Sequence, residues 1–463
     1  MSSKTDLKSQ QGAARCEAIS WQQLLDQETV PVPLYLREDV NPDKGDEDLP
    51  FHRYISRDFH LKEKEKLWPR VWQMTCREED IPEAGDHFVY DICDESVLIV
   101  RGEDDKIRAF INACLHRGRT LRDESGQVSE LRCPFHGFTW RLDGSFSHMP
   151  CAWDFKHLEK VDMRLPQLKL DTWGGFIFVN FDDDSEPLHD YLGVMPDHFA
   201  RFPLEDYFTG VHVQRVVPSN WKVAHEAFME SWHTIETHSQ ILTFTGDANS
   251  QYDCFGDNIS RSVTPMAVPS PHLSGVDEKT TMKDILKLSG RMALDDDDGL
   301  DLPDDISARE YIGELNRQLF SEASGENLDD ATHAELLDAI LYSSFPNFQV
   351  WIGYHGNIVY QFRPNGDDHE TAIMNVRVLL RYPKGTERPD ACEINVIDPS
   401  LPFESAPELG ALGEVFDQDV DNLQALHKGM KTSKRGAARL ASYQESRIRH
   451  LHQTIDKYID AHA

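Results

Sequence analysis

The sequence has few basic residues and no long hydrophobic run. Its 463 residues include 47 Lys and Arg against 80 Asp and Glu, a formal net charge of -33 at pH 7. Such a surface repels nucleic-acid backbones and anionic membranes, so we expect neither as a partner. No apolar run approaches the length that crosses a bilayer, and the opening MSSKTDLKSQ contains no apolar signal core. These absences predict a soluble, cytoplasmic protein.

Two further absences narrow the function. The eight Cys are scattered through the chain, a pattern that does not predict a disulfide framework. No strand-turn-helix segment carries a convincing G-x-G-x-x-G fingerprint for a dinucleotide. We therefore expect any NADH used by this protein to bind a partner protein.

The length of the chain suits two domains. Short alternating runs between Gly85 and Phe181, separated by Asp and Gly turns, predict strands, and we place a small all-β domain at residues 58–184. The remainder, 1–57 and 185–463, is predicted to form one larger domain. It has long strands over 345–398 and helices over 408–461. The irregular, acidic stretch over 245–335 is interpreted as a lid, surface loops and short helices.

The small domain contains four candidate metal ligands. Cys114 and His116 form C-x-H, and sixteen residues later Cys133 and His136 form C-x-x-H. Two thiolates and two imidazoles can bind one zinc ion, which would make this a zinc-stapled structural protein. They can also bind a 2Fe-2S cluster, with both Cys on one iron and both His on the other. The spacing, the Pro in the second loop and the all-β surroundings favour the cluster.

A second group of candidate ligands lies in the larger domain. A helix is predicted to start after Ser219 or Asn220 and to run to about His238. Within it, Glu230 and His233 share one helix face. His233 and His238 are five residues apart, so binding one metal requires a π-bulge or a loosened helix end.

Two His and one carboxylate form a facial triad for Fe(II) that leaves positions open for O₂. The third ligand is sought in the segment FDQDVDN, where Asp417, Asp419 and Asp421 compete on composition alone.

Together these motifs resemble the Rieske-type non-haem iron oxygenases, and specifically the α subunits of aromatic ring-hydroxylating enzymes such as naphthalene and biphenyl dioxygenases. The resemblance covers about Trp68 to Tyr458. It favours Asp419 as the third iron ligand, because the segment from Asp419 to Gly429 resembles the family's C-terminal ligand helix. Three positions depart from the family's usual residues: Ala227, Trp232 and His427. We expect Ala227 and Trp232 to change the shape of the substrate pocket.

The resemblance implies an α+β fold, with an antiparallel Rieske domain and a larger helix-grip domain whose curved antiparallel sheet cradles helices. It implies a terminal oxygenase with a Rieske 2Fe-2S cluster and a mononuclear Fe(II), which activates O₂ and hydroxylates a small organic substrate. We expect cis-dihydroxylation of an aromatic or polycyclic or terpenoid compound. The alternative is a monooxygenase or demethylase that acts on quaternary amines or methoxy-aromatics. A non-catalytic electron carrier would need only residues 58–184.

The resemblance also implies partners. Electrons are expected from a ferredoxin or an NAD(P)H-dependent reductase, and the chain is expected to form a homotrimer, with or without a small β subunit. Glu230 is expected to bridge His136 of one copy to His233 of another, which couples the two metal sites. Arg117 and Arg119 are candidates to receive an acidic donor. An apolar pocket is expected beside the iron, with these candidate lining residues: Phe228, Met229, Ile235, Leu242, Phe345, Asn347 and Trp351.

Overall fold

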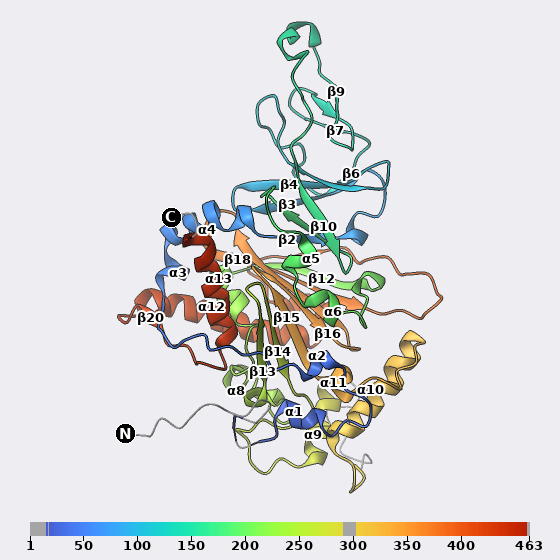
Figure 1. Ribbon diagram of the computed structural model, residues 1–463, viewed down its shortest axis with the longest axis vertical. Coiled ribbons are helices and arrows are strands. Elements are labelled where there is room, and N and C mark those ends of the chain that lie inside the picture. The colour runs from blue at the N-terminus through green and yellow to red at the C-terminus, as the bar shows by residue number, and fades with distance from the viewer. Residues whose placement is uncertain (1–14, 17, 290–301, 461–463) are drawn as a thin grey trace.

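The computed structural model describes residues 15–16, 18–289 and 302–460. Its β-structure falls mainly into three sheets, which confirms the predicted α+β class. The two sheets built from residues 73–180 stand at one end of the molecule (Figure 1). The helices α8 (Thr234–Thr237), α9 (Glu278–Leu288) and α10 (Ala308–Ser324) lie at the other end. None of the helices in the described ranges is long and apolar enough to span a membrane.

A seven-stranded antiparallel sheet forms the base of the small domain, in the order β2-β11-β10-β5-β4-β3-β6. A three-stranded sheet, β7-β8-β9, extends from it and supports the second cluster loop. The strands are β2 (Gln73–Arg77), β3 (Asp86–Ile92), β4 (Glu95–Arg101), β5 (Ile107–Ile111), β6 (Gly126–Gln127), β7 (Leu131–Arg132), β8 (Thr139–Trp140), β9 (Phe146–His148), β10 (Gln167–Trp173) and β11 (Phe176–Asn180).

An eight-stranded sheet forms the larger domain, in the order β13-β14-β15-β16-β17-β18-β12-β19. All neighbours are antiparallel except β12 and β19. The strands are β12 (Phe208–Val217), β13 (Gln251–Phe255), β14 (Ile259–Thr264), β15 (Ala339–Ser344), β16 (Phe348–Ile352), β17 (Asn357–Asn365), β18 (Asp368–Leu380) and β19 (Asn395–Ile397).

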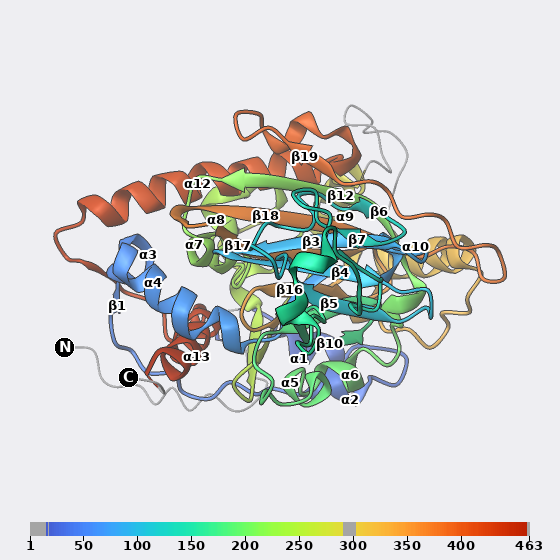
Figure 2. The ribbon, with the colours of Figure 1, turned by 90° about the horizontal axis from the view of Figure 1, so that it is seen from above.

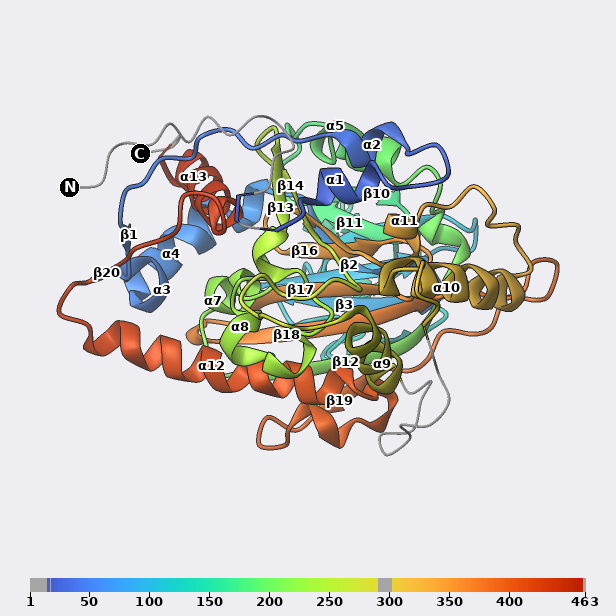
Figure 3. The same ribbon diagram turned by 90° about the horizontal axis from the view of Figure 1, so that it is seen from below.

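Helices surround this sheet, and α7, α8, α9 and α12 are seen in front of its strands from below (Figure 3). The helices are α1 (Trp21–Leu25), α2 (Leu34–Arg37), α3 (His52–Ile55), α4 (Arg57–Lys66), α5 (Leu188–Tyr191), α6 (Met195–His198), α7 (Trp221–Glu226), α8 (Thr234–Thr237), α9 (Glu278–Leu288), α10 (Ala308–Ser324), α11 (His333–Leu337), α12 (Leu412–Thr432) and α13 (Ser446–Asp460). A short pair, β1 (Leu49–Pro50) and β20 (Ala437–Ala438), joins the N-terminal segment to the chain between α12 and α13.

The two domains share a continuous core. The ring of Phe348 on β16 meets Phe176 and Phe178 on β11 edge to face, at centroid distances of 5.0 and 5.6 Å. Arg377 on β18 binds both carboxylate oxygens of Asp80 at 2.9 and 2.6 Å. The seven-stranded sheet therefore rests on the eight-stranded one, as the view from above also shows (Figure 2).

The expectation of an irregular stretch over 245–335 is wrong. It contains β13, β14 and the 17-residue helix α10. The ends of α10 follow ordinary signals, because the Ser307 side chain accepts from Glu310 N–H and Gly325 closes the helix at φ +70°. The acidic composition of this stretch concealed those signals.

Candidate metal centres

The two loops of the small domain have the same backbone geometry. The carbonyl of Cys114 accepts from Gly118 N–H at 2.9 Å, and that of Cys133 accepts from Gly137 N–H at 3.0 Å. Both glycines have left-handed φ values, +75° and +76°. An L side chain is strained in that region, so glycine is the natural residue for closing both turns. The C-x-H and C-x-x-H motifs thus build two matching finger-like loops.

The four candidate ligands of these loops differ in depth. Cys114 and Cys133 are buried at 4% and 2% exposure, and burial raises the pKa of the Cys114 thiol. The rings of His116 and His136 lie 4.7 Å apart, and His136 is exposed. A pair of inner thiolates and a pair of outer imidazoles is the division that a Rieske cluster requires.

The spacing of these side chains argues against one zinc ion. A single zinc with bonds of about 2.0–2.3 Å would draw all four ligand atoms close together. No three of the four come within 4.8 Å of one another. The arrangement fits two separate pairs, one for each iron of a cluster.

The predicted helix through His238 is wrong as a regular helix. Helix α7 begins after Asn220, whose side chain accepts from Lys222 N–H, and it ends at Glu226. The four-residue α8 follows, with His233 at its N-terminal boundary and His238 at its C-terminal boundary. The break supplies the loosened helix that the spacing of the two histidines requires.

The imidazoles of His233 and His238 both direct Nε2 toward the carboxylate of Asp419. Nδ1 of His233 lies 2.8 Å from Glu230 Oε1, and Nδ1 of His238 lies 2.7 Å from Gln418 Oε1. Each Nδ1–H is therefore positioned to donate to an oxygen, which directs Nε2 toward Asp419. The two Nε2 atoms lie 3.7 and 3.0 Å from Asp419 Oδ1. Both ring nitrogens of His238 face oxygen atoms, whereas a neutral imidazole carries a proton on only one nitrogen. A cation between Nε2 and Asp419 therefore fits this arrangement better than a neutral ring alone.

Asp419 comes from α12, which passes beside α8 (Figure 3). His233, His238 and Asp419 place one ligand atom each within 4.8 Å of the others. Asp417 is used elsewhere, since its carboxylate accepts from Phe403 N–H and Glu404 N–H. Asp421 is exposed. The geometry therefore selects Asp419 from the three candidates.

The electrostatics of this group favour a cation. Burial lowers the pKa of His233, but the carboxylates of Glu230 and Asp419 outweigh burial and raise the pKa to about 9. Two His and one carboxylate are the ligand set of mononuclear Fe(II) oxygenases. The residues present therefore fit such an iron.

Comparison with known proteins connects both centres to one family. The Rieske 2Fe-2S domain family matches residues 71–161. The catalytic domain of the ring-hydroxylating alpha subunit family matches residues 198–461, which is more than half of the chain. The chain belongs to the ring-hydroxylating oxygenase alpha subunits.

Individual members of this family and its solved structures are distant. The carnitine monooxygenase oxygenase subunit of Acinetobacter baumannii is 28% identical over 188 residues, which cover 40% of this chain and 51% of that protein. The alpha subunit of biphenyl 2,3-dioxygenase from Rhodococcus jostii is 30% identical over 195 residues, 41% of this chain and 42% of that protein. The chain thus matches about half or less of the length of these relatives. A naphthalene 1,2-dioxygenase variant bound to phenanthrene has the same fold, with a TM-score of 0.64 at 18% identity over 91% of this chain and 94% of that chain.

A cavity of about 430 Å³ opens beside the triad of this oxygenase subunit. Helices α9 and α10 contribute Leu286, Ile312 and Phe320, and the sheet contributes Trp351 and Tyr360. None of the lining residues in the described ranges is Lys or Arg, and the lining carboxylates are Glu230 and Asp419. The wall is largely apolar, with a few neutral polar side chains besides the triad, among them Thr245, Asn316 and His355.

The expected pocket residues divide unevenly. Phe228 and Trp351 line the cavity, whereas Met229, Ile235, Leu242, Phe345 and Asn347 do not. Of the three departures from the family pattern, Ala227 lines the cavity. Trp232 points outward at 43% exposure, and His427 is buried at 5% away from the cavity. The expectation that Trp232 shapes the pocket is therefore wrong.

Sequence reasoning missed Gln418, which holds His238. Its Oε1 also accepts from Gln240 Nε2 at 2.9 Å. The available signal was its position next to Asp419 on the same helix. Of the two basic loop residues, Arg119 is engaged with Asp123, and the Arg117 guanidinium lies 5.5 Å from the Phe135 ring.

Proposed function

We propose that this chain is the terminal oxygenase component of a Rieske oxygenase system, acting on a neutral, largely apolar organic substrate. Residues 58–184 would form the cluster domain, with Cys114, His116, Cys133 and His136 as the ligands. His233, His238 and Asp419 would hold the iron. When bound, the cluster supplies single electrons and the iron activates O₂ for hydroxylation. The observation that carries the proposal is the triad placed beside a largely apolar cavity whose described lining has no Lys or Arg.

The charge of the cavity selects the substrate class. An organic acid would need a basic partner, and the described lining has no Lys or Arg. A quaternary ammonium would need an aromatic cage and a pocket carboxylate. The cavity offers aromatic rings such as Trp351 and Tyr360, yet Glu230 accepts from both N–H groups of His233, the ring Nδ1–H and the backbone N–H. Asp419 faces both Nε2 atoms. A neutral substrate is therefore favoured over carnitine-like or betaine-like ones.

The size of the cavity points to a compound with several rings. A volume of about 430 Å³ lies at the lower end of ordinary ligand pockets, which span roughly 300–1,000 Å³. The apolar residues along its length favour a polycyclic aromatic or terpenoid skeleton.

The separation of the two centres supports assembly of several copies. In one chain the cluster loops beside β7 and the iron segment at α8 lie toward opposite ends of the longest axis (Figure 1). Electrons would have to pass between chains, as they do in a ring in which each cluster faces a neighbour's iron. His136 is exposed at the loop tip, and Glu230 already holds His233, so Glu230 is suited to bridge the two rings. We propose a homotrimer that receives electrons from a ferredoxin or reductase.

A product assay tests this function. The assembled protein with cluster and iron confirmed is reduced and given ¹⁸O₂ with matched compounds: a polycyclic hydrocarbon, its carboxylic acid and its trimethylammonium derivative. We expect label in the neutral compound alone, with two labelled oxygens if the product is a cis-dihydrodiol. Label in the acid or the ammonium compound alone would overturn the proposed substrate class. No labelled product from a broad panel of neutral compounds would overturn the oxygenase assignment.

A further inference from the structure

The segment between α7 and α8 carries Glu230 but has no helix of its own. It spans residues 227–233, and we call its central residues, Met229, Glu230 and Ser231, the Glu230 link. Neighbouring elements hold it in place. Ser231 N–H donates to the Tyr252 hydroxyl at 3.2 Å, and Ser231 Oγ lies 2.5 Å from Ser250 Oγ. The carbonyl of Met229 accepts from Arg447 Nη1 at 2.8 Å.

Arg447 on α13 is a buried cation without a carboxylate partner. Its side chain is fully buried, and burial lowers the pKa of its guanidinium to about 10, so it stays charged at neutral pH. Besides Met229 it binds three serine hydroxyls, at 2.5 to 3.1 Å: Ser260, Ser262 and Ser343. No ion pair of Arg447 is found within the described part of the chain.

Three other buried arginines of this domain are neutralised, whereas Arg449 is also buried and binds backbone carbonyls. Arg261 pairs with Asp253 at 2.7 Å, Arg309 with Asp338 at 2.6 Å, and Arg377 with Asp80 at 2.6 Å. A buried charge without a counter-charge is costly unless neutral dipoles satisfy it. The charged Arg447 therefore depends on the neutral groups that it binds. One of them is the carbonyl of Met229, the residue before Glu230.

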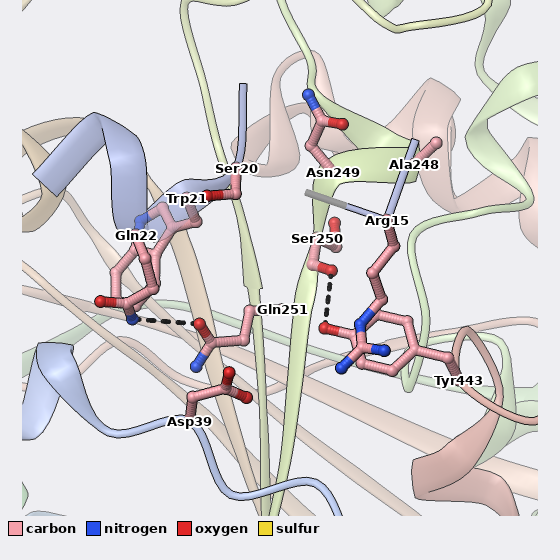
Figure 4. A pocket seen from close by; sticks show the side chains of 10 residues that line it. All are labelled: Arg15, Ser20, Trp21, Gln22, Asp39, Ala248, Asn249, Ser250, Gln251 and Tyr443. Atoms are coloured by element: carbon pink, nitrogen blue, oxygen red, sulfur yellow. Dashed lines mark hydrogen bonds between the residues drawn. The ribbon is translucent and has the colours of Figure 1, made fainter. Parts of the chain in front are cut away.

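Tyr443, just before α13, also contacts residues that hold the Glu230 link. Tyr443 donates to the carbonyl of Ser250 at 3.4 Å, and its ring packs edge-on against Tyr252 at 5.4 Å. Figure 4 shows this bond, with Arg15 lying against the Tyr443 ring. Ser250 and Tyr252 are the residues that hold Ser231, so both contacts of Tyr443 converge on the Glu230 link.

We propose that Arg447 is a positioning residue: its guanidinium fixes the Met229 carbonyl and thereby sets the Glu230 carboxylate against His233. The inference rests on the proposed function, because it assigns Glu230 to the iron site. Without the guanidinium, the Met229 carbonyl loses a charged donor, and the link is held less firmly on the Met229 side while its Ser231 contacts remain. Glu230 would then orient His233 less well, which weakens metal binding and the coupling between centres.

The test uses Arg447→Gln and Arg447→Lys in the assembled, cluster-containing protein. The first readout is the affinity for Co²⁺ after removal of the mononuclear metal, measured by visible absorption. The second is the rate of cluster reoxidation in a single turnover. We expect Arg447→Gln to lower both by about tenfold or more. Arg447→Lys keeps a cationic donor and is expected to stay within about threefold of wild type.

Thr454→Val is the matched control on the same helix. Thr454 is buried and its hydroxyl donates to the carbonyl of Asp257, away from the Glu230 link. Thermal unfolding of all variants separates lost stability from lost positioning. An assembled Arg447→Gln protein with wild-type cobalt affinity and reoxidation rate would overturn the proposal.

If Arg447→Gln does not assemble, Ser343→Ala decides, because it removes one acceptor that fixes the guanidinium. A cobalt affinity lower than that of Thr454→Val supports the proposal, and an affinity equal to it overturns the proposal. Failure of the wild-type protein to bind cobalt would instead count against the iron site itself.

Discussion

The two metal centres are built in different ways. The proposed cluster ligands occupy two nearby loops of the small domain, Cys114 to His136, and each loop is closed by its own hydrogen bonds and glycine. The proposed iron ligands come from a broken helix and from α12, so only tertiary packing brings His233 and Asp419 together. One centre is a local property of the sequence, and the other is a property of the whole fold. The two should therefore fail independently and in response to different kinds of change.

The largest effect is expected for Asp419→Ala. Losing a direct ligand should cost more than the 10- to 100-fold typical of an outer hydrogen-bond partner, so mononuclear iron and product should fall by more than about 100-fold. Iron and sulfide analysis should still find an intact cluster. Asp421→Asn, on the exposed side of the same helix, is the control. The converse variant, Cys133→Ser, should lose sulfide and keep the mononuclear metal. Loss of both centres in either variant would refute their independence.

Gln418→Leu should give an intermediate effect, because it changes the orientation of a ligand and not the ligand itself. The Nδ1–H of His238 would lose its acceptor, and the ring would be free to turn Nε2 away from Asp419. We expect metal affinity to fall by about 10- to 100-fold with the cluster spectrum unchanged. Cobalt titration measures the first quantity and visible absorption the second. An affinity equal to that of wild type would show that packing alone orients His238.

The smallest effects are expected at the two loop glycines. Alanine in the left-handed region costs about 1–2 kcal/mol, so both Gly118→Ala and Gly137→Ala should destabilise the cluster domain. A Cβ at Gly137 would also lie 3.2 Å from Pro150 Cγ, whereas one at Gly118 would meet nothing within 4 Å. Gly137→Ala should therefore bleach the cluster at the lower denaturant concentration. The reverse order, or equal denaturant concentrations, would contradict the effect expected from the Pro150 contact.

The comparison also explains what the sequence could reveal. The α+β class and the two loops that carry the proposed cluster ligands could be predicted from short motifs and strand patterns, because their geometry depends on residues close in sequence. The choice of Asp419 over Asp417 and Asp421 did not follow from composition, since it depends on how α12 lies against α8. Arg447 and most pocket residues were missed for the same reason. Ile235 and Met229 flank the ligands in sequence, but the break after Glu226 turns them away from the cavity.

The placement of the two centres toward opposite ends of the folded molecule has a genetic consequence. If each cluster serves the iron of a neighbouring copy, a chain without a cluster and a chain without an iron are complementary. An assembly that contains both kinds has one junction where an intact cluster faces an intact iron. Two inactive alleles expressed together would then restore activity to each other, and neither would do so alone.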